Sequence, residues 1–177
     1  NGRGGSFTNK NPKVGGFARA DYTGIKGLLA GVSIYADNRI KMFDIHADYK
    51  IGAFEAYGVY TQTTRSNGGQ LVAGESTKAK GGYLNLSYDI LSFTGSKYRV
   101  PIFIQYDSVD AQSSLVAPTT AQYDPVNTTT VGINFYPHEQ VVFKADYAMP
   151  DNSFGNDLST NTKNGEDIFS ISLGFIF

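Results

Sequence analysis

An acid and histidine cluster in residues 44–48 is the part of the sequence best suited to chemistry. Asp44, His46 and Asp48 alternate with apolar residues, so on an extended strand they share one face at spacings of about 6.5–7 Å. Three such groups on one strand cannot reach a single metal ion at ligand distances of about 2 Å without help from a neighbouring residue. A catalytic Asp–His pair also needs a nucleophile or a second acid beside it, which the sequence does not place there. We therefore expect no metal, no cofactor and no catalytic residues, and interpret the cluster as part of a polar wall.

Composition excludes several other classes of function. The 177 residues carry 15 Lys and Arg against 16 Asp and Glu, so there is no basic excess to bind nucleic acid. The chain contains no Cys, which removes disulfides, Cys-zinc sites and thiol nucleophiles. Residues 69–76 are similar to a phosphate loop, but Glu75 stands where that motif requires Lys.

The dominant pattern in the chain is alternation of apolar and polar residues with a period of two. No apolar run approaches the roughly 18 residues that a membrane helix needs. The alternation instead predicts about nine strands of roughly 8–11 residues, the length that a tilted strand needs to cross a bilayer. The alternating residues on which these strands are centred lie in residues 18–22, 28–35, 43–49, 54–60, 84–90, 100–106, 131–135, 141–147 and 169–177.

The charged residues of these strands fall almost entirely on the side opposite the apolar residues, with Lys41 as the exception. The polar side also carries Asn, Ser and Gly, whereas the apolar side carries large aromatic residues near strand ends. This arrangement is typical of a membrane barrel with lipid outside and a polar interior. A soluble antiparallel sandwich or barrel with one buried face is the alternative. The predicted pore-lining residues are Arg19, Asp21, Asp44, His46, Asp48, Glu55, Asp89, Arg99, Asp107, Lys144 and Asp146.

Acidic residues outnumber basic residues on this predicted inner side, even when Lys50 is counted with the basic ones. Rings of carboxylates in a pore favour cations, whereas rings of Arg or Lys favour anions. We therefore expect the channel to prefer cations.

The connections between the predicted strands alternate between short and long through much of the chain. Residues 62–79, 108–127 and 149–166 are long and polar, whereas residues 136–139 form a tight turn. Outer-membrane barrels combine short periplasmic turns with long outer loops. The first two long segments are candidates for a loop that folds into the pore and narrows it.

The last predicted strand, Phe169-Ser-Ile-Ser-Leu-Gly-Phe-Ile-Phe177, resembles the C-terminal signal of bacterial outer-membrane barrels. Residues 130–147, which hold a Pro-containing turn and the run Lys144-Ala-Asp-Tyr147, resemble the penultimate hairpin of porins of the phosphate-selective O/P type. The resemblance implies a Gram-negative outer-membrane location, contact with outer-membrane lipid and a homotrimer. Phosphate specificity is not implied, because the Arg and Lys ladder of those porins is missing here. The residues that the barrel assembly machinery would recognise are Phe169, Ile171, Leu173, Phe175 and Phe177.

Together these patterns predict an all-β fold, a transmembrane antiparallel up-and-down β-barrel, with residues 1–177 in a single domain. If the C-terminus is periplasmic, as in the family, counting strands back puts residues 1–12 on the outer side. Complete bacterial barrels have an even strand number, so we expect the C-terminal part of a larger barrel of roughly 16 to 18 strands. The alternative is a complete barrel of about eight strands. The expected periplasmic aromatic girdle consists of Tyr22, Tyr49, Phe54, Phe135 and Phe175.

The predicted function is that of a non-enzymatic porin, a passive diffusion channel for small hydrophilic solutes or ions. The first alternative is a small closed barrel with a structural, adhesion or anchoring role, whose interior is filled with paired charges. An outer-membrane hydrolase would need a compact acid, base and nucleophile, with His46 essential for activity. A soluble lipocalin-like carrier would need solubility without detergent, against which the outward Phe and Tyr residues argue.

Overall fold

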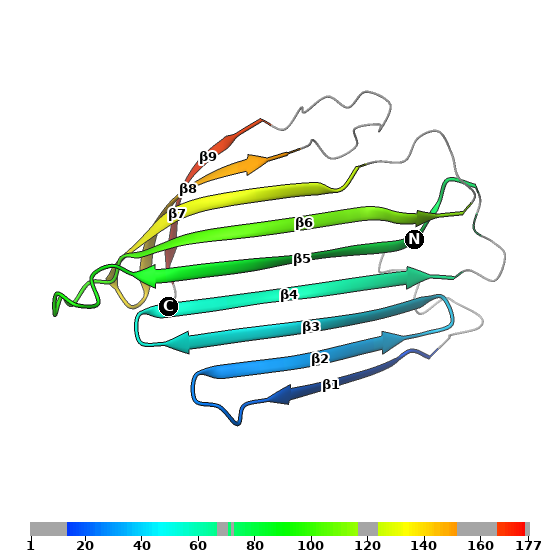
Figure 1. The fold of residues 1–177 in the computed structure, drawn as a ribbon, viewed down its shortest axis with the longest axis horizontal. Helices are drawn as coiled ribbons and strands as arrows, with labels where there is room; N and C mark the ends of the chain where they lie inside the picture. Colours follow the sequence, from blue (N-terminus) through cyan, green and yellow to red (C-terminus); the bar gives the residue numbers. More distant parts are fainter. Residues whose placement is uncertain (1–13, 67–70, 72, 117–123, 152–165, 176–177) are drawn as a thin grey trace.

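The computed structural model describes residues 14–66, 71, 73–116, 124–151 and 166–175. These residues form one antiparallel sheet of nine strands, in which each strand pairs with the next one along the chain (Figure 1). The nine strands that we expect from the sequence are confirmed. Their bounds are β1 Gly16–Tyr22, β2 Leu28–Ala36, β3 Ile40–Ile51, β4 Phe54–Arg65, β5 Ser76–Asp89, β6 Pro101–Leu115, β7 Val126–His138, β8 Val141–Pro150 and β9 Ile168–Phe175.

Two tight connections show how the sequence reverses the chain. Gly52, between β3 and β4, has a φ of +58°, a conformation that glycine adopts without the steric cost of a side chain. Between β2 and β3, one carboxylate oxygen of Asp37 accepts hydrogen bonds of 2.6 Å from the backbone N–H groups of both Arg39 and Ile40. These bonds hold the pKa of Asp37 below its ordinary value, because they stabilise the ionised form.

Three of the four connections at one end of the sheet span ten or more residues, whereas three of the four at the other end span five or fewer (Figure 1). The exceptions are residues 37–39 at the first end and residues 90–100 at the second. One end, called here the short-turn end, holds the connections at residues 23–27, 52–53, 90–100 and 139–140. The opposite long-loop end holds the connections at residues 37–39, 66–75, 116–125 and 151–167.

The strands at the long-loop end run further than the alternation predicts. The expected loops at residues 62–79 and 108–127 are shorter in the structure. There β4 continues to Arg65, β5 begins at Ser76 and β6 continues to Leu115. These extensions are rich in Thr, Ser, Gln and Lys on both sides of the strand. The ladder nevertheless continues through pairs such as Thr64 with Lys78. These strand ends could not be predicted from alternation, because apolar and polar residues no longer alternate in them.

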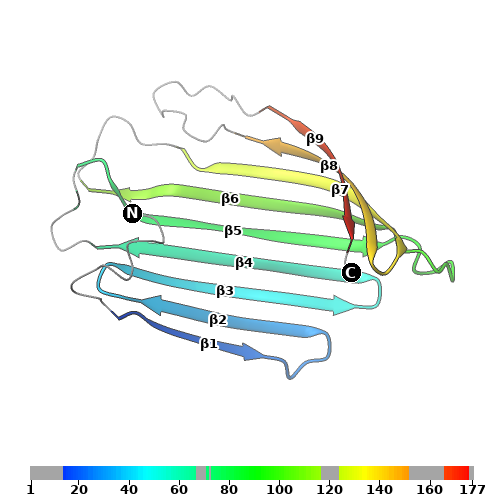
Figure 2. The same ribbon diagram turned by 180° about the vertical axis from the view of Figure 1, so that it is seen from behind.

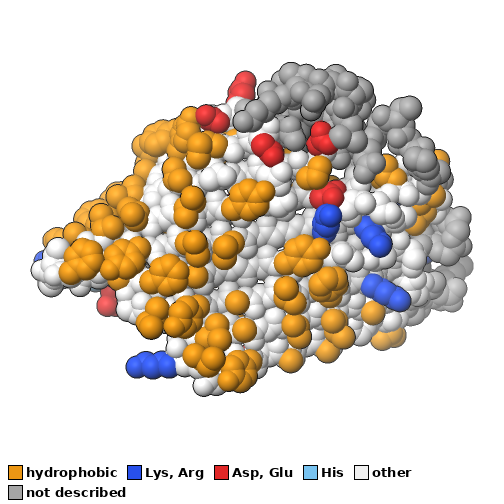
Figure 3. Space-filling view, in the orientation of Figure 1, with side chains coloured by type: hydrophobic (Ala, Val, Ile, Leu, Met, Phe, Trp, Pro, Cys, Tyr) orange, Lys and Arg blue, Asp and Glu red, His pale blue; other side chains and the backbone are white. Residues whose placement is uncertain are grey.

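The sheet is curved, and its two faces differ in chemistry. Seen from behind, β7, β8 and β9 curl toward the viewer and make that face concave (Figure 2). Hydrophobic side chains are spread over most of the opposite convex face, and charged side chains lie at its margins (Figure 3). The described residues contain no buried hydrophobic core, and Ile104 and Leu84 are 48% and 52% exposed. The described residues contain no helix long and apolar enough to span a membrane.

Candidate functional site

The register of the sheet brings the charged residues of separate strands onto the concave face. One row runs Asp21, Gly31, His46, Val59, Tyr83 and Asp107 across β1 to β6, and the neighbouring row runs Arg19, Ser33, Asp44 and Thr61 across β1 to β4. The concave face thereby carries all eleven positions named from the sequence, namely Arg19, Asp21, Asp44, His46, Asp48, Glu55, Asp89, Arg99, Asp107, Lys144 and Asp146.

A hydrogen-bonded network joins β1, β2 and β3 at one side of this face. The Arg19 guanidinium donates to Asp21 at 2.9 Å, and His46 Nε2 lies 2.9 Å from the same carboxylate. His46 Nδ1 lies 2.8 Å from Asp44, which also accepts a hydrogen bond of 3.1 Å from the Ser33 hydroxyl. We call these five residues the His46 network. Its net charge is zero when the imidazole is protonated and minus one when it is neutral.

Gly31 is the residue that allows this network to form. It lies on β2 between Asp21 on β1 and His46 on β3, and all three belong to one row. A Cβ at position 31 would collide with the Asp21 carboxylate and come within 2.5 Å of His46 Nε2. The missing side chain therefore leaves the space through which the two side chains meet across an intervening strand.

The geometry of the His46 network does not offer a catalytic triad. A Ser–His–Asp arrangement needs the serine hydroxyl on one imidazole nitrogen and the acid on the other. Here both nitrogens of His46 face carboxylates, and the Ser33 hydroxyl is bonded to Asp44 instead. Within the part of the chain that the structure describes, no group of three or more His, Cys, Asp or Glu residues could hold a metal ion.

A polar hollow of about 460 Å³ lies on the concave face where the sheet curls across β4 to β8. Asn85, at 4% exposure, lines it and donates a hydrogen bond of 3.0 Å to the Gln105 side chain. Gln105 in turn donates to both oxygens of Asp107 at 3.0 Å. The hollow thus has in its wall two hydrogen-bonded amide side chains, and Asp107 beside the hollow holds one of them in place.

Several charges on the concave face are paired with a neighbour. Lys50 lies 3.7 Å from Glu55, and Arg99 lies 3.5 Å from Asp89 and over the ring of Tyr136. Asp48, Asp107 and Asp146 form no ion pair with any other described residue. Carboxylates therefore contribute the larger share of the unpaired charge on this face.

Asn85, Gln105 and Phe103 are residues of the hollow that the sequence reasoning missed. Only ionisable residues were chosen as candidates, so the two amides were left out. Their alternation with apolar neighbours, such as Leu84 and Ile104, already placed them on the polar side. The Phe103 ring lies over Gly132, where an added Cβ would come within 2.5 Å of it. A glycine facing an aromatic residue on the neighbouring strand is visible only once the register is known.

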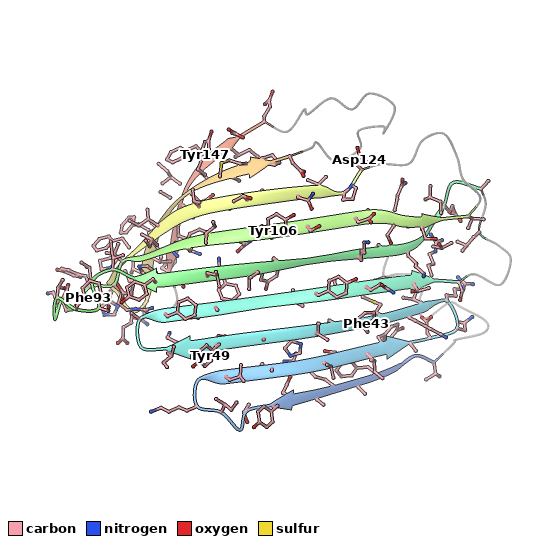
Figure 4. All side chains as sticks on the ribbon, viewed as in Figure 1. Phe43, Tyr49, Phe93, Tyr106, Asp124 and Tyr147 are labelled. Carbon is pink, nitrogen blue, oxygen red and sulfur yellow. The ribbon has the colours of Figure 1, made fainter. Side chains whose placement is uncertain are left out.

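The convex face holds the residues expected to contact lipid. Phe43 and Tyr49 on β3, Tyr106 on β6 and Tyr147 on β8 reach this face from three separate strands (Figure 4). Phe169, Ile171, Leu173 and Phe175 also belong to it, with exposures of 56–75%, whereas Phe177 lies outside the described residues. The convex face at the short-turn end carries Tyr22, Tyr49, Phe54, Phe135 and Phe175.

Aromatic rings contact one another at the short-turn end. The centroid of the Phe135 ring lies 5.8 Å from that of Tyr98 and 6.3 Å from that of Phe143. The ring centroids of Tyr88 and Phe93 are 6.1 Å apart. Such pairs of rings are favourable beyond the area that they bury. They concentrate aromatic surface in a band along one end of the sheet.

Comparison of the chain with models of protein families, with curated proteins and with solved structures found no match.

Proposed function

We propose that this chain forms part of a β-barrel porin in the outer membrane of Gram-negative bacteria. The porin is a passive channel for small hydrophilic solutes or ions and needs no cofactor. The observation that carries the proposal is the pair of unlike faces on one curved sheet: a convex face of exposed hydrophobic side chains and a concave face of charged and polar ones.

The exposed convex face favours lipid over water as its surroundings. A water-soluble antiparallel sheet buries its apolar face against a second layer of protein, and burial contributes about 25 cal/mol per Å² of apolar surface. The described residues supply no such layer, because they form a single sheet in which strands contact only their neighbours. Hydrocarbon around a barrel would satisfy the same side chains without a protein core.

The edges of the sheet favour a larger barrel. Within the described residues, β1 and β9 each pair on one side only. A sheet in hydrocarbon must close, because each unpaired backbone group there costs several kcal/mol. We infer that the nine strands are joined by further strands in a barrel of roughly 16 to 18, which is wide enough for an aqueous channel. A homotrimer is the assembly that the resemblance to porins suggests.

The charges of the concave face favour cations. The three carboxylates without an ion pair, Asp48, Asp107 and Asp146, would line the channel, and carboxylates there attract cations and repel anions. Lys144 is the described basic residue of that face with no such pair. The inferred channel is therefore cation-selective and weakly so.

The test is electrical. Protein purified from outer membranes is added to a planar lipid bilayer, and single-channel steps and the reversal potential under a KCl gradient are recorded. We expect discrete conductance steps and a reversal potential of the sign that indicates cation flow. A reversal potential with anion sign would contradict the selectivity, and stable insertion without any conductance would contradict the channel.

A second candidate is a small closed barrel with a structural or anchoring role. It is favoured by the ion pairs Lys50–Glu55 and Arg99–Asp89 together with the His46 network, because paired charges of this kind also fill the interior of narrow barrels. Insertion without conductance, together with an intact mass near 19.2 kDa for the mature protein, would support this candidate. A mass about twice that or more would support the large porin.

A further inference from the structure

Three lysines lie together on the convex face, at its long-loop end, where polar residues such as Thr64 and Asp110 also lie. Lys41 on β3 and Lys78 on β5 both pair with Thr64 on β4, so two strand spacings of about 4.8 Å separate them. Lys80 lies two residues along β5 from Lys78, about 7 Å away on the same side. Figure 3 shows basic side chains gathered at that end of the convex face. We call these residues the lysine cluster.

The lysine cluster carries a net positive charge. All three residues are exposed, and Lys80 lies 3.6 Å from Asp110 on β6. Lys41 and Lys78 have no ion pair among the described residues. Three ammonium groups and one carboxylate leave two net positive charges. Lysine ammonium groups spaced in this way can contact different oxygens of the same phosphate-bearing molecule.

An apolar groove begins directly beside Lys80. It has a volume of about 270 Å³ and is lined by Tyr60, Gly82, Leu84 and Tyr106 together with Lys80. Gly82 must lack a side chain because a Cβ there would come within 2.5 Å of the Val59 carbonyl oxygen, and this absence opens the groove. A second hollow of about 420 Å³ shares Tyr60 and Leu84 with it and continues over the small residues of β3 and β4.

A cationic cluster at the end of an apolar groove matches the two parts of an anionic lipid. We propose that the lysine cluster binds the phosphate groups of a phosphorylated membrane lipid, with one acyl chain of that lipid lying in the groove. The inference rests on the proposed function, because the convex face meets lipid only if the sheet spans a membrane. Long loops mark the outer side of such a barrel, so the lipid belongs to the outer leaflet.

The binding experiment compares two double variants with the same change of charge. Lys41→Gln with Lys78→Gln removes the two lysines of the cluster that have no ion pair. Lys26→Gln with Lys97→Gln removes two exposed lysines at the short-turn end and serves as the matched control. Each purified protein in nonionic detergent is titrated with diphosphoryl lipid A, and retained lipid is measured by native mass spectrometry.

We expect the cluster variant to lose affinity for diphosphoryl lipid A by about tenfold to thirtyfold, and the control variant to keep that of the parent protein. Phosphatidylcholine, which has no net charge, should be bound equally by all three proteins. Equal affinity of both double variants for lipid A would overturn the inference. So would displacement of the lipid by millimolar inorganic phosphate, because free phosphate would then be the preferred source of the anion.

Insertion into lipid vesicles, measured on the same preparations, separates the two proposals. If the proteins insert and lipid A binding does not respond to the lysine changes, the inference fails and the porin assignment stands. If the parent protein does not insert into vesicles at all, the porin assignment fails and this inference fails with it.

Discussion

On β6, Ile104 and Gln105 are adjacent in the chain but project from opposite faces of the sheet. Gln105 accepts a hydrogen bond from Asn85 and donates to Asp107, so neighbours on its own face satisfy its polar groups. Ile104 is 48% exposed, and no second layer of described residues covers its face. The polar face is thus organised by contacts within the protein, whereas the apolar face depends on the surrounding medium.

This difference determines how each face should respond to substitution. If the sheet spans a membrane as proposed, a change on the convex face alters the transfer of a side chain between water and hydrocarbon, an effect set by depth in the membrane. A change on the concave face alters local hydrogen bonds, charge and space, and water can replace part of what is lost. Comparing matched substitutions on the two faces therefore tests whether the sheet lies in a membrane.

The largest effect is expected for a charge placed on the convex face. Ile104→Arg should lower the free energy of unfolding in lipid vesicles by about 2–4 kcal/mol, because the guanidinium would have to enter hydrocarbon. The matched control is Thr130→Arg, on the adjacent strand β7 and in the wall of the polar hollow. It should lower the free energy of unfolding by less than about 1 kcal/mol. Urea titration of both variants measures the difference. Equal costs would mean that the two faces meet the same solvent.

The next effect tests the space on the concave face. Gly31→Ala should abolish the contact between His46 Nε2 and Asp21, because the added methyl group occupies the gap, while the contact of Nδ1 with Asp44 is kept. Nitrogen-15 NMR of the His46 side chain distinguishes the two nitrogens. Gly174→Ala is the control on the same face, since its Cβ would meet only a Val142 methyl group at 3.1 Å. An unchanged Nε2 signal in the Gly31 variant would contradict the network.

The sequence was sufficient to predict which residues share a face of the sheet, but not which side chains on neighbouring strands contact one another. Strict alternation in segments such as Phe169 to Phe175 determines which residues share a face, since one step of two residues is one step along that face. Alternation within a strand says nothing about its register against the next strand. The Asp21–Gly31–His46 row and the Phe103–Gly132 contact depend on that register, so they became visible only in the structure.

The ends of the strands were hardest to predict for a related reason. In residues 76–82 neither side of β5 carries a large apolar side chain, so the alternation that marks a strand disappears although the backbone ladder to β4 continues. Lys78 therefore lay inside the expected loop of residues 62–79, and Lys80 lay just after it, outside every expected strand. Lys41, recognised as an exception to the one-sided charges, was the visible part of the lysine cluster.

A smaller effect is expected from the unpaired carboxylates. In the proposed channel, changing Asp48, Asp107 and Asp146 together to Asn should lower the ratio of potassium to chloride permeability by about twofold, since each charge would act across screened, water-filled space. The reversal potential under a KCl gradient measures that ratio. Asp110→Asn, a carboxylate on the convex face of the same β6 strand as Asp107, should leave it unchanged. A larger shift from Asp110 than from the triple variant would reverse the assignment of the inner face.

The smallest effect is expected at Asp37, which lies in the turn between β2 and β3 and belongs to neither face of the sheet. Its carboxylate accepts hydrogen bonds from the Arg39 and Ile40 amides, which lowers its pKa in the folded protein. The stabilisation is therefore complete above the unfolded pKa of about 3.9 and is lost as the pH falls through the lower folded value. In detergent micelles, the amide proton shifts of Arg39 and Ile40 should titrate together with a midpoint below that value. A midpoint above it would mean that the carboxylate does not hold this turn, and the reversal of the chain would then rest on the neighbouring ladders alone.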